Sequence, residues 1–257
     1  MELRGRRALV TGGGRGIGRA IALRLAAAGV DLVLAARGAA EIERVGEEAR
    51  RIGVKAVPRT ADVGRPEDVR ALFAAARQAL GGVDILVNGA GIAPSAPLVK
   101  TTDETWQQVL AVNLSGVFHG MREALPEMAE RGWGRVVNVA SVAGKAGMPY
   151  VAAYVASKHG VLGLTKVAAL EFADKGVTVN AVCPGYVDTP MTDGSVARIA
   201  AKTGRSEAAV RQHIESLSPQ KRMVTVDEVA ALVLFLCGDE ARGITGQGLN
   251  VDGGSVM

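Results

Sequence analysis

The chain has 257 residues, a formal net charge of +4 and a hydrophobic fraction of 48%. This length and composition suit one large α/β domain with a sizeable core. The chain contains no uncharged apolar run of about 18 residues, which argues against a membrane-spanning helix. Its arginines are scattered and do not alternate with aromatic residues, which argues against a nucleic-acid surface.

The cysteines and the first residues point to the cytoplasm. The apolar run near the start is too short for a signal peptide. Cys183 and Cys237 form no spacing motif, as expected for free thiols in a reducing compartment. The three histidines are scattered without metal-ligand spacing, so we expect no metal site.

Short β-branched runs alternate with helical stretches along the chain. The predicted strands are Arg7–Val10, Asp31–Ala35, Val54–Arg59, Ile85–Asn88, Arg135–Val139, Val177–Cys183 and Gly248–Val251. The predicted helices are Ile17–Ala28, Ala39–Ile52, Pro66–Leu80, Thr102–Glu130, Ala153–Asp174 and Val226–Cys237. This alternation predicts a Rossmann-like, doubly wound parallel sheet of about seven strands in a single domain over residues 1–257.

One region interrupts this alternation. Residues 189–223 are polar, contain Gly194, Gly204 and Pro219, and include an amphipathic stretch from Ser206 to Leu217. We interpret this region as a helical lid over the substrate end of the sheet.

A glycine-rich loop follows the first predicted strand. Gly12, Gly16 and Gly18 give the spacing G-x-x-x-G-x-G, with Gly14, Arg15 and Ile17 between them. Glycines let the backbone approach a pyrophosphate, and the N-terminus of the next helix offers free N–H groups to it. A strand before the loop and a helix after it are the context that a dinucleotide-binding motif needs.

The end of the second strand bears on the choice of cofactor. An acidic residue there would bind a ribose 2′-hydroxyl, but the sequence reads Ala-Ala-Arg37-Gly. Arg37 could bind a 2′-phosphate, and Arg15 could flank it from the glycine loop. We therefore predict NADP(H) in preference to NAD(H).

Tyr154 and Lys158 are the candidate proton-transfer pair. Residues four apart share a helix face, whereas Tyr150 is eight residues from Lys158 and out of reach. The lysine ammonium, together with an oxidised nicotinamide, should lower the pKa of the Tyr154 phenol towards the range of a general acid or base.

Two other polar residues complete the candidate site. Ser141 follows a predicted strand, where a parallel sheet presents side chains to its ligand crevice, and its hydroxyl could hydrogen-bond a developing alkoxide. Asn113 is a poor helix former among apolar neighbours. It is either a satisfied buried amide or the holder of a water molecule in a proton relay.

With these residues in view, the sequence resembles the short-chain dehydrogenase/reductase family from about Leu3 to Gly254. The matching segments are TGGGRGIG at 11–18, AAR at 35–37, ADV at 61–63, NGAG at 88–91, VN at 112–113, NVAS at 138–141, YVASK at 154–158, NAVCPGYVDTP at 180–190 and ITGQGLNVDGG at 244–254. One departure is Gly89, where the family pattern has a second Asn; we expect it to loosen the local turn.

The resemblance implies a role for each matching residue. It implies that the catalytic residues are Asn113, Ser141, Tyr154 and Lys158, and that Lys158 also binds the nicotinamide ribose. It implies that the other cofactor contacts are Asp62 and Val63 at adenine, Asn88, Gly89, Ala90 and Gly91 along the cleft, and Pro184, Gly185, Val187 and Thr189 at the carboxamide. It also implies a homotetramer.

Two sub-groups of the family look similar, and they point to different substrates. The C-terminal third resembles 3-hydroxybutyrate dehydrogenases, which use NAD, but the positions of their carboxylate-binding residues hold Ala93, Ala143 and Val151. The stretch GKAGMPYVAAYVASKHG resembles polyketide ketoreductases and 3-oxoacyl reductases, which use NADPH. The expected pocket residues are Ala93, Ala143, Met148, Tyr150, Tyr186 and Met191, which suggest a wide apolar pocket.

These inferences predict an NADPH-dependent reductase of 3-oxoacyl or polyketide-like ketones, acting on a small-molecule carbonyl or alcohol. One alternative is an NAD-dependent hydroxy-acid or secondary-alcohol dehydrogenase. A second alternative is a non-catalytic dinucleotide-binding regulator, against which the intact Ser141, Tyr154 and Lys158 argue.

Overall fold

The computed structural model describes residues 3–256. One parallel sheet of seven strands forms its centre, with the strand order β3-β2-β1-β4-β5-β6-β7. The strands are β1 (Arg7–Thr11), β2 (Asp31–Ala36), β3 (Ala56–Thr60), β4 (Ile85–Asn88), β5 (Gly134–Val139), β6 (Val177–Pro184) and β7 (Gly248–Val251). Every predicted strand is therefore present, and the single-domain doubly wound fold is confirmed.

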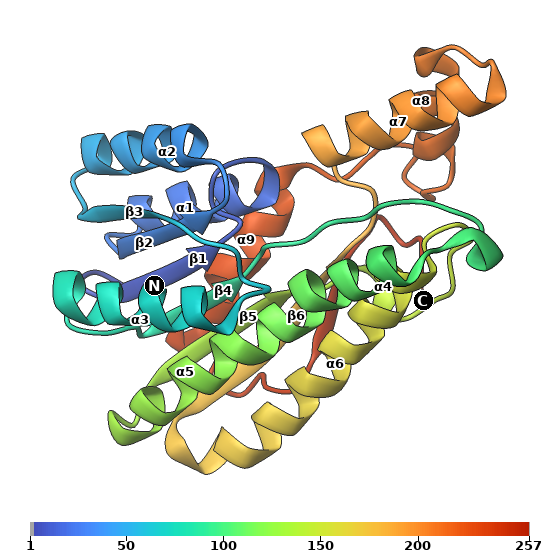
Figure 1. Ribbon diagram of the computed structural model, residues 1–257. Helices are drawn as coiled ribbons and strands as arrows, with labels where there is room; N and C mark the ends of the chain where they lie inside the picture. The colour runs from blue at the N-terminus through green and yellow to red at the C-terminus, as the bar shows by residue number, and fades with distance from the viewer. Residues whose placement is uncertain (1–2, 257) are drawn as a thin grey trace.

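Helices cover both faces of the sheet (Figure 1). They are α1 (Gly16–Ala27), α2 (Ala39–Ile52), α3 (Pro66–Leu80), α4 (Asp103–Leu110), α5 (Gly116–Glu130), α6 (Ala152–Phe172), α7 (Pro190–Thr203), α8 (Glu207–Ser216) and α9 (Val226–Cys237). Helices α1, α2 and α9 pack on one face around one apolar core. Helices α3, α5 and α6 pack on the other face around a second core.

The central strands are buried because helices lie on both of their faces. All eight residues of β6 are buried, including Asn180, whose side-chain amide bonds the main chain near Ile244 and Gln247. Helix boundaries follow local signals. Thr225 and Glu228 form a capping box at the start of α9, and Gly53 ends α2 with a φ of 106°.

The predicted helix Thr102–Glu130 is not continuous. A π-helical turn at Ala111–Ser115 separates α4 from α5. Such a turn widens the helix and redirects its side chains, and it often occurs at functional sites. Here it carries Asn113, whose bonds are described below.

The region 189–223 contains two helices, α7 and α8, which stand apart from the two layers (Figure 1). The predicted amphipathic stretch forms α8, and its buried Val210 and Ile214 face Val196 of α7 and Met223 in a small separate core. Within residues 3–256, no helix is long and apolar enough to cross a membrane.

Candidate active site

The candidate site lies where four neighbouring strands end. Strands β1, β4, β5 and β6 end at Thr11, Asn88, Val139 and Pro184. The chain order reverses between β1 and β4, and a doubly wound sheet opens a ligand crevice at such a point.

The glycine loop between β1 and α1 has no space for side chains at two of its glycines. A Cβ atom at Gly18 would lie 2.1 Å from the Gly12 carbonyl oxygen, and one at Gly12 would lie 2.7 Å from the Gly89 oxygen. Gly12 and Gly16 have φ values of 70° and 51°, in the left-handed region. The loop therefore places backbone groups without side chains, and the N-terminus of α1, at the crevice. Such backbone N–H groups are suited to binding a pyrophosphate.

Thr11 ties the two sides of the crevice together. Its Oγ1 accepts hydrogen bonds from the backbone N–H groups of Gly89 (3.1 Å) and Ala90 (3.3 Å). A Cβ atom at Gly89 would lie 2.7 Å from the Thr11 carbonyl oxygen. The expectation that Gly89 loosens this turn is therefore wrong, because the missing side chain lets the two strand ends approach more closely.

Ser141, Tyr154 and Lys158 meet at the end of β5. The Tyr154 phenol lies near Ser141, whose hydroxyl acts to lower the phenol pKa. That hydroxyl accepts the N–H of Ala143 at 3.1 Å and donates to the Pro184 carbonyl oxygen at 3.5 Å. The Lys158 Nζ lies 5.5 Å from the centroid of the Tyr154 ring and donates to the Val139 carbonyl oxygen at 2.7 Å. The structure thus brings the predicted serine, tyrosine and lysine together, and it leaves Tyr150 64% exposed outside them.

In the chain alone, the pKa of the Tyr154 phenol is raised, and Lys158 is not among the groups that lower it. Burial raises this pKa, and the neighbouring Ser141 hydroxyl only partly opposes that rise. Lys158 directs its ammonium at the Val139 carbonyl, and burial lowers the pKa of Lys158 from 10.5 to about 8. In the chain alone, therefore, the phenol stays protonated at neutral pH, as a proton donor must be.

Asn113 joins the π-helical turn to the loop after β4. Its side chain donates to the Ile92 carbonyl (2.9 Å), accepts from the Ile92 N–H (2.9 Å) and donates to the Ser157 hydroxyl (3.2 Å). Ser157 in turn donates to the Tyr154 carbonyl at 2.7 Å. Asn113 is fully buried, so it is a satisfied amide that positions the loop and the helix carrying Tyr154.

The other residues expected at the cofactor lie around the same crevice. A Cβ atom at Gly91 would lie 3.5 Å from Asn113 Oδ1 and 3.8 Å from Lys158 Nζ. A Cβ atom at Gly16 would lie 3.4 Å from Thr189 Cγ2, so the glycine loop touches the link from β6 to α7. That link also carries Pro184, Gly185 and Val187.

The residues expected at adenine and its ribose follow β2 and β3. Asp62 accepts the Gly64 N–H at 2.9 Å, and Val63 is buried beside it. Arg37 is exposed just after β2, and within residues 3–256 no hydrogen bond or ion pair holds its side chain. Ile17 packs partly buried against the core under α1.

The expected pocket residues differ in exposure. Tyr186 and Met191 are 41% and 46% exposed, whereas Ala143 is fully buried. Ala93 and Met148 are half-buried. Leu98 and Val99, in the 3-10 turn Leu98–Lys100 after β4, are 72% and 91% exposed and were not predicted as pocket residues.

Two further residues, which were not predicted from the sequence, position the backbone of the site. Thr11 and Ser157 hold the backbone around the glycine loop and Tyr154. Both lie inside motifs that were recognised, TGGGRGIG and YVASK, but their bonds are visible only in three dimensions.

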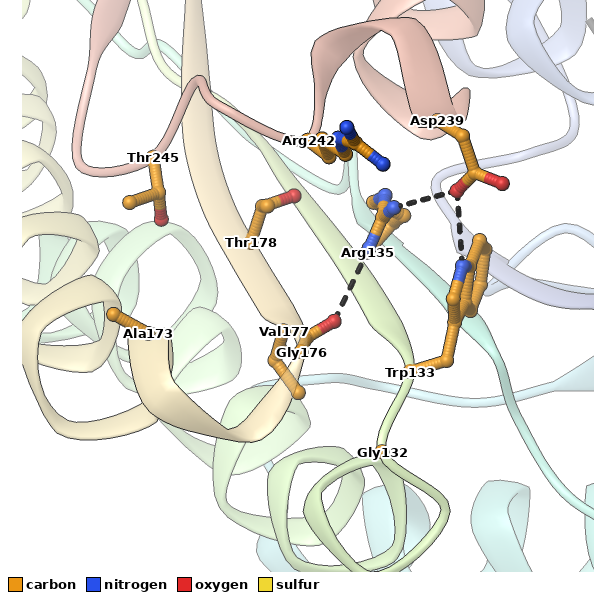
Figure 2. A pocket seen from close by; sticks show the side chains of 10 residues that line it. All are labelled: Gly132, Trp133, Arg135, Ala173, Gly176, Val177, Thr178, Asp239, Arg242 and Thr245. Atoms are coloured by element: carbon orange, nitrogen blue, oxygen red, sulfur yellow. Dashed lines mark hydrogen bonds and ion pairs between the residues drawn. The ribbon is translucent and has the colours of Figure 1, made fainter.

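A cavity of about 410 Å³ lies at the opposite edge of the sheet, where β5 and β6 begin (Figure 2). Buried Arg135 donates there to the Gly176 carbonyl (3.2 Å) and to Asp239 (2.9 Å), which also accepts the Trp133 indole N–H (3.1 Å). Its guanidinium stacks on the Trp133 ring. These contacts tie the start of β5 to the segment after α9, so we interpret the cluster as structural.

Comparison with known proteins identifies the class of protein. A protein-family model described as enoyl-(acyl carrier protein) reductase matches residues 12–256. The chain belongs to the short-chain dehydrogenase/reductase family, as its motifs suggested.

Particular relatives fall into the two sub-groups that the sequence suggested. D-beta-hydroxybutyrate dehydrogenase of Rhizobium meliloti (strain 1021) is 42% identical over 96% of this chain and 97% of its own. Granaticin polyketide synthase ketoacyl reductase 1 of Streptomyces violaceoruber is 43% identical over 96% of this chain and 92% of its own. The crystal structure of a variant actinorhodin polyketide ketoreductase with NADPH superimposes with a TM-score of 0.94, at 42% identity and 97% coverage of both chains. The chain is thus a short-chain oxidoreductase with ketoreductases among its relatives.

Proposed function

We propose that this protein uses NADPH to reduce a ketone, of the 3-oxoacyl or polyketide kind, to a secondary alcohol. The observation that carries the proposal is the group formed by Ser141, Tyr154 and Lys158 beside the glycine loop. When bound, the cofactor supplies a hydride from the nicotinamide ring.

The residues of the chain then have distinct tasks. The backbone of the glycine loop and the N-terminus of α1 bind the pyrophosphate. Tyr154 donates its proton to the ketone oxygen as negative charge develops there, and Ser141 stabilises that charge with a hydrogen bond. Lys158 binds the ribose and keeps positive charge near the phenol, while Asn113 holds the loop and helix that frame the site.

The names of the ketoacyl reductase relatives support reduction as the direction of the reaction. Reduction requires the protonated form of the Tyr154 phenol, which is the ordinary form of a tyrosine at neutral pH.

Arg37 and Arg15 support NADPH as the cofactor. Arg37 is an exposed guanidinium without an internal partner in the part of the chain that the structure describes. Guanidinium groups bind phosphate through paired hydrogen bonds, so such a group is available for a 2′-phosphate.

The mouth of the site supports an apolar substrate larger than a four-carbon acid. Tyr150, Tyr186 and Met191 are exposed around it, and no charged group replaces the missing carboxylate-binding residues at Ala93 and Ala143. The names of the ketoacyl reductase relatives agree with such a substrate.

Two variants test the chemistry and the cofactor. We expect Tyr154→Phe to lower kcat by about 10²–10⁴-fold while leaving the affinity for NADP⁺ nearly unchanged. Turnover that stays undiminished in the variant would refute the role of Tyr154. A wild type that binds the dinucleotide but turns over no carbonyl or alcohol would favour the non-catalytic regulator. We expect Arg37→Asp to shift cofactor preference towards NADH, and an unchanged preference would remove Arg37 from the proposal.

The hydroxybutyrate dehydrogenase relative favours one second candidate, an NAD-dependent hydroxy-acid dehydrogenase. A panel of 3-oxoacyl thioesters, cyclic ketones and 3-hydroxy acids, assayed with both cofactors, separates the two. Faster turnover of 3-hydroxybutyrate with NAD⁺ than of any ketone with NADPH would reject the ketoreductase.

We propose in addition that the protein assembles as a homotetramer. Exposed apolar side chains on α5 and α6, among them Phe118 (43%), Val167 (52%) and Leu170 (83%), support a face that another copy covers. Light scattering on the eluted protein tests this, and a monomeric mass would contradict it.

A further inference from the structure

An acidic residue lies among the groups expected to bind the 2′ end of the cofactor. Glu41 is in the first turn of α2, four residues after Arg37. Its Oε1 lies 3.6 Å from Nη1 of Arg15, which precedes α1 in the glycine loop. Neither the sequence motifs nor the family pattern assigned a role to this carboxylate.

The backbone around Glu41 fixes where its side chain lies. A Cβ atom at Gly14 would lie 3.0 Å from the Glu41 Cβ, and one at Gly38 would lie 2.9 Å from the Glu41 Oε2. Glu41 therefore packs between the glycine loop and the turn after β2. Those segments are themselves tied, because the N–H groups of Gly12 (2.7 Å) and Gly13 (3.2 Å) donate to the Ala35 carbonyl.

The negative charge of Glu41 affects how strongly a cofactor with a 2′-phosphate can bind. Two guanidinium groups, those of Arg15 and Arg37, flank this end of the crevice, and Glu41 pairs with the first of them. A 2′-phosphate that binds here must compete with the carboxylate for Arg15 and bear its repulsion. A ribose 2′-hydroxyl bears no such repulsion, and a carboxylate is its usual hydrogen-bond acceptor.

We propose that Glu41 is a second determinant of cofactor choice, which acts against Arg37 by holding Arg15 and weakening binding of a 2′-phosphorylated dinucleotide. This inference rests on the proposed function, since it concerns the same cofactor site. It adds that the preference for NADPH is moderate in the wild type and can be strengthened by one neutral substitution.

The size of the effect follows from the exposure of the pair. The side chains of Arg15 and Glu41 are 65% and 42% exposed, so solvent screens their interaction. Removing one such exposed charge should change binding of a phosphate by about fivefold. The change should shrink as ionic strength rises, because salt screens exposed charges.

The test compares Glu41→Gln with a matched control, Glu43→Gln. Glu43 lies on the same helix and pairs with Arg50 at 2.6 Å, so its substitution removes an equal charge without touching the crevice. Calorimetry measures the affinity of each protein for adenosine 2′,5′-bisphosphate and for 5′-AMP, and then for NADP⁺ and NAD⁺. These titrations need no turnover.

We expect Glu41→Gln to raise the affinity ratio of 2′-phosphorylated to unphosphorylated ligand about fivefold, and Glu43→Gln to leave it nearly unchanged. Equal ratios for the two variants would overturn the proposal. Repeating Glu41→Gln in an Arg15→Gln background should remove most of the gain, and a gain that persists there would overturn the part of the proposal that works through Arg15.

These measurements distinguish a failure of the proposal for Glu41 from a failure of the proposal that the cofactor is NADPH. If Arg37→Asp lowers the ratio while Glu41→Gln does nothing, Glu41 is rejected and the choice of NADPH stands. If the wild type binds the unphosphorylated ligand better and Arg37→Asp changes nothing, the choice of NADPH is rejected, and a rise on Glu41→Gln still supports the role of Glu41.

Discussion

Lys158 should make the folded protein less stable at neutral pH than an apolar residue in its place. The ammonium is only 4% exposed, and burial lowers its pKa from 10.5 to about 8. The unfolded chain binds the proton more tightly than the folded chain does. The resulting cost is fully present below pH 8 and is relieved as the pH rises towards the unfolded value of about 10.4.

The magnitude follows from that difference in pKa, which corresponds to about 3 kcal/mol. Lys158→Met removes this cost, but it leaves the Val139 carbonyl without its donor, which costs about 1–3 kcal/mol. At pH 7 the variant should therefore match or exceed the wild type in stability. Between pH 7 and pH 10.5 the wild type should gain about 3 kcal/mol relative to the variant, whatever the exact cost at Val139.

Urea unfolding of the cofactor-free proteins at both pH values measures this change. Lys166→Met, which removes an exposed lysine from the same helix, controls for the change in net charge. A stability difference between wild type and Lys158→Met that is the same at both pH values would refute the reasoning, since it would mean that burial does not perturb this lysine.

Two further substitutions test the crevice. Asn113→Ala should lower the free energy of unfolding by about 2–4 kcal/mol, because both backbone groups of Ile92 lose their partners; a loss below about 1 kcal/mol in urea unfolding would contradict this. Gly18→Ala should weaken NADP⁺ binding at least about tenfold, because the new Cβ would lie 2.1 Å from the Gly12 oxygen and must displace the loop. An unchanged affinity in a fluorescence titration would show that the loop adjusts without cost.

Much of the fold was predictable because its signals are local. Helices α2, α3 and α9 begin and end at the predicted residues, each marked by Pro, Gly or a cap. The π-helical turn was not predictable, since the apolar spacing across Ala111–Ser115 still looks helical. The side chain of Asn113 in this turn bonds the backbone of Ile92, which lies 21 residues away in the chain.

The grouping of the proposed catalytic side chains was predictable for a similar reason. Tyr154 and Lys158 share a helix, and Ser141 ends a strand at the edge where ligands bind. The direction of the Tyr154 pKa was not predictable, because it depends on how deeply the phenol is buried and on where the Lys158 ammonium points. Neither the burial of the phenol nor the direction of the ammonium can be inferred from the spacing of these residues in the sequence.

The approach of Gly89 to Thr11 restricts how this chain can change during evolution. An asparagine at position 89 belongs to the ordinary pattern of the family, yet here its Cβ would lie 2.7 Å from a backbone oxygen. An asparagine at this position therefore requires the end of β1 to shift, so the residue tolerated at position 89 is coupled to the position of the Thr11 backbone.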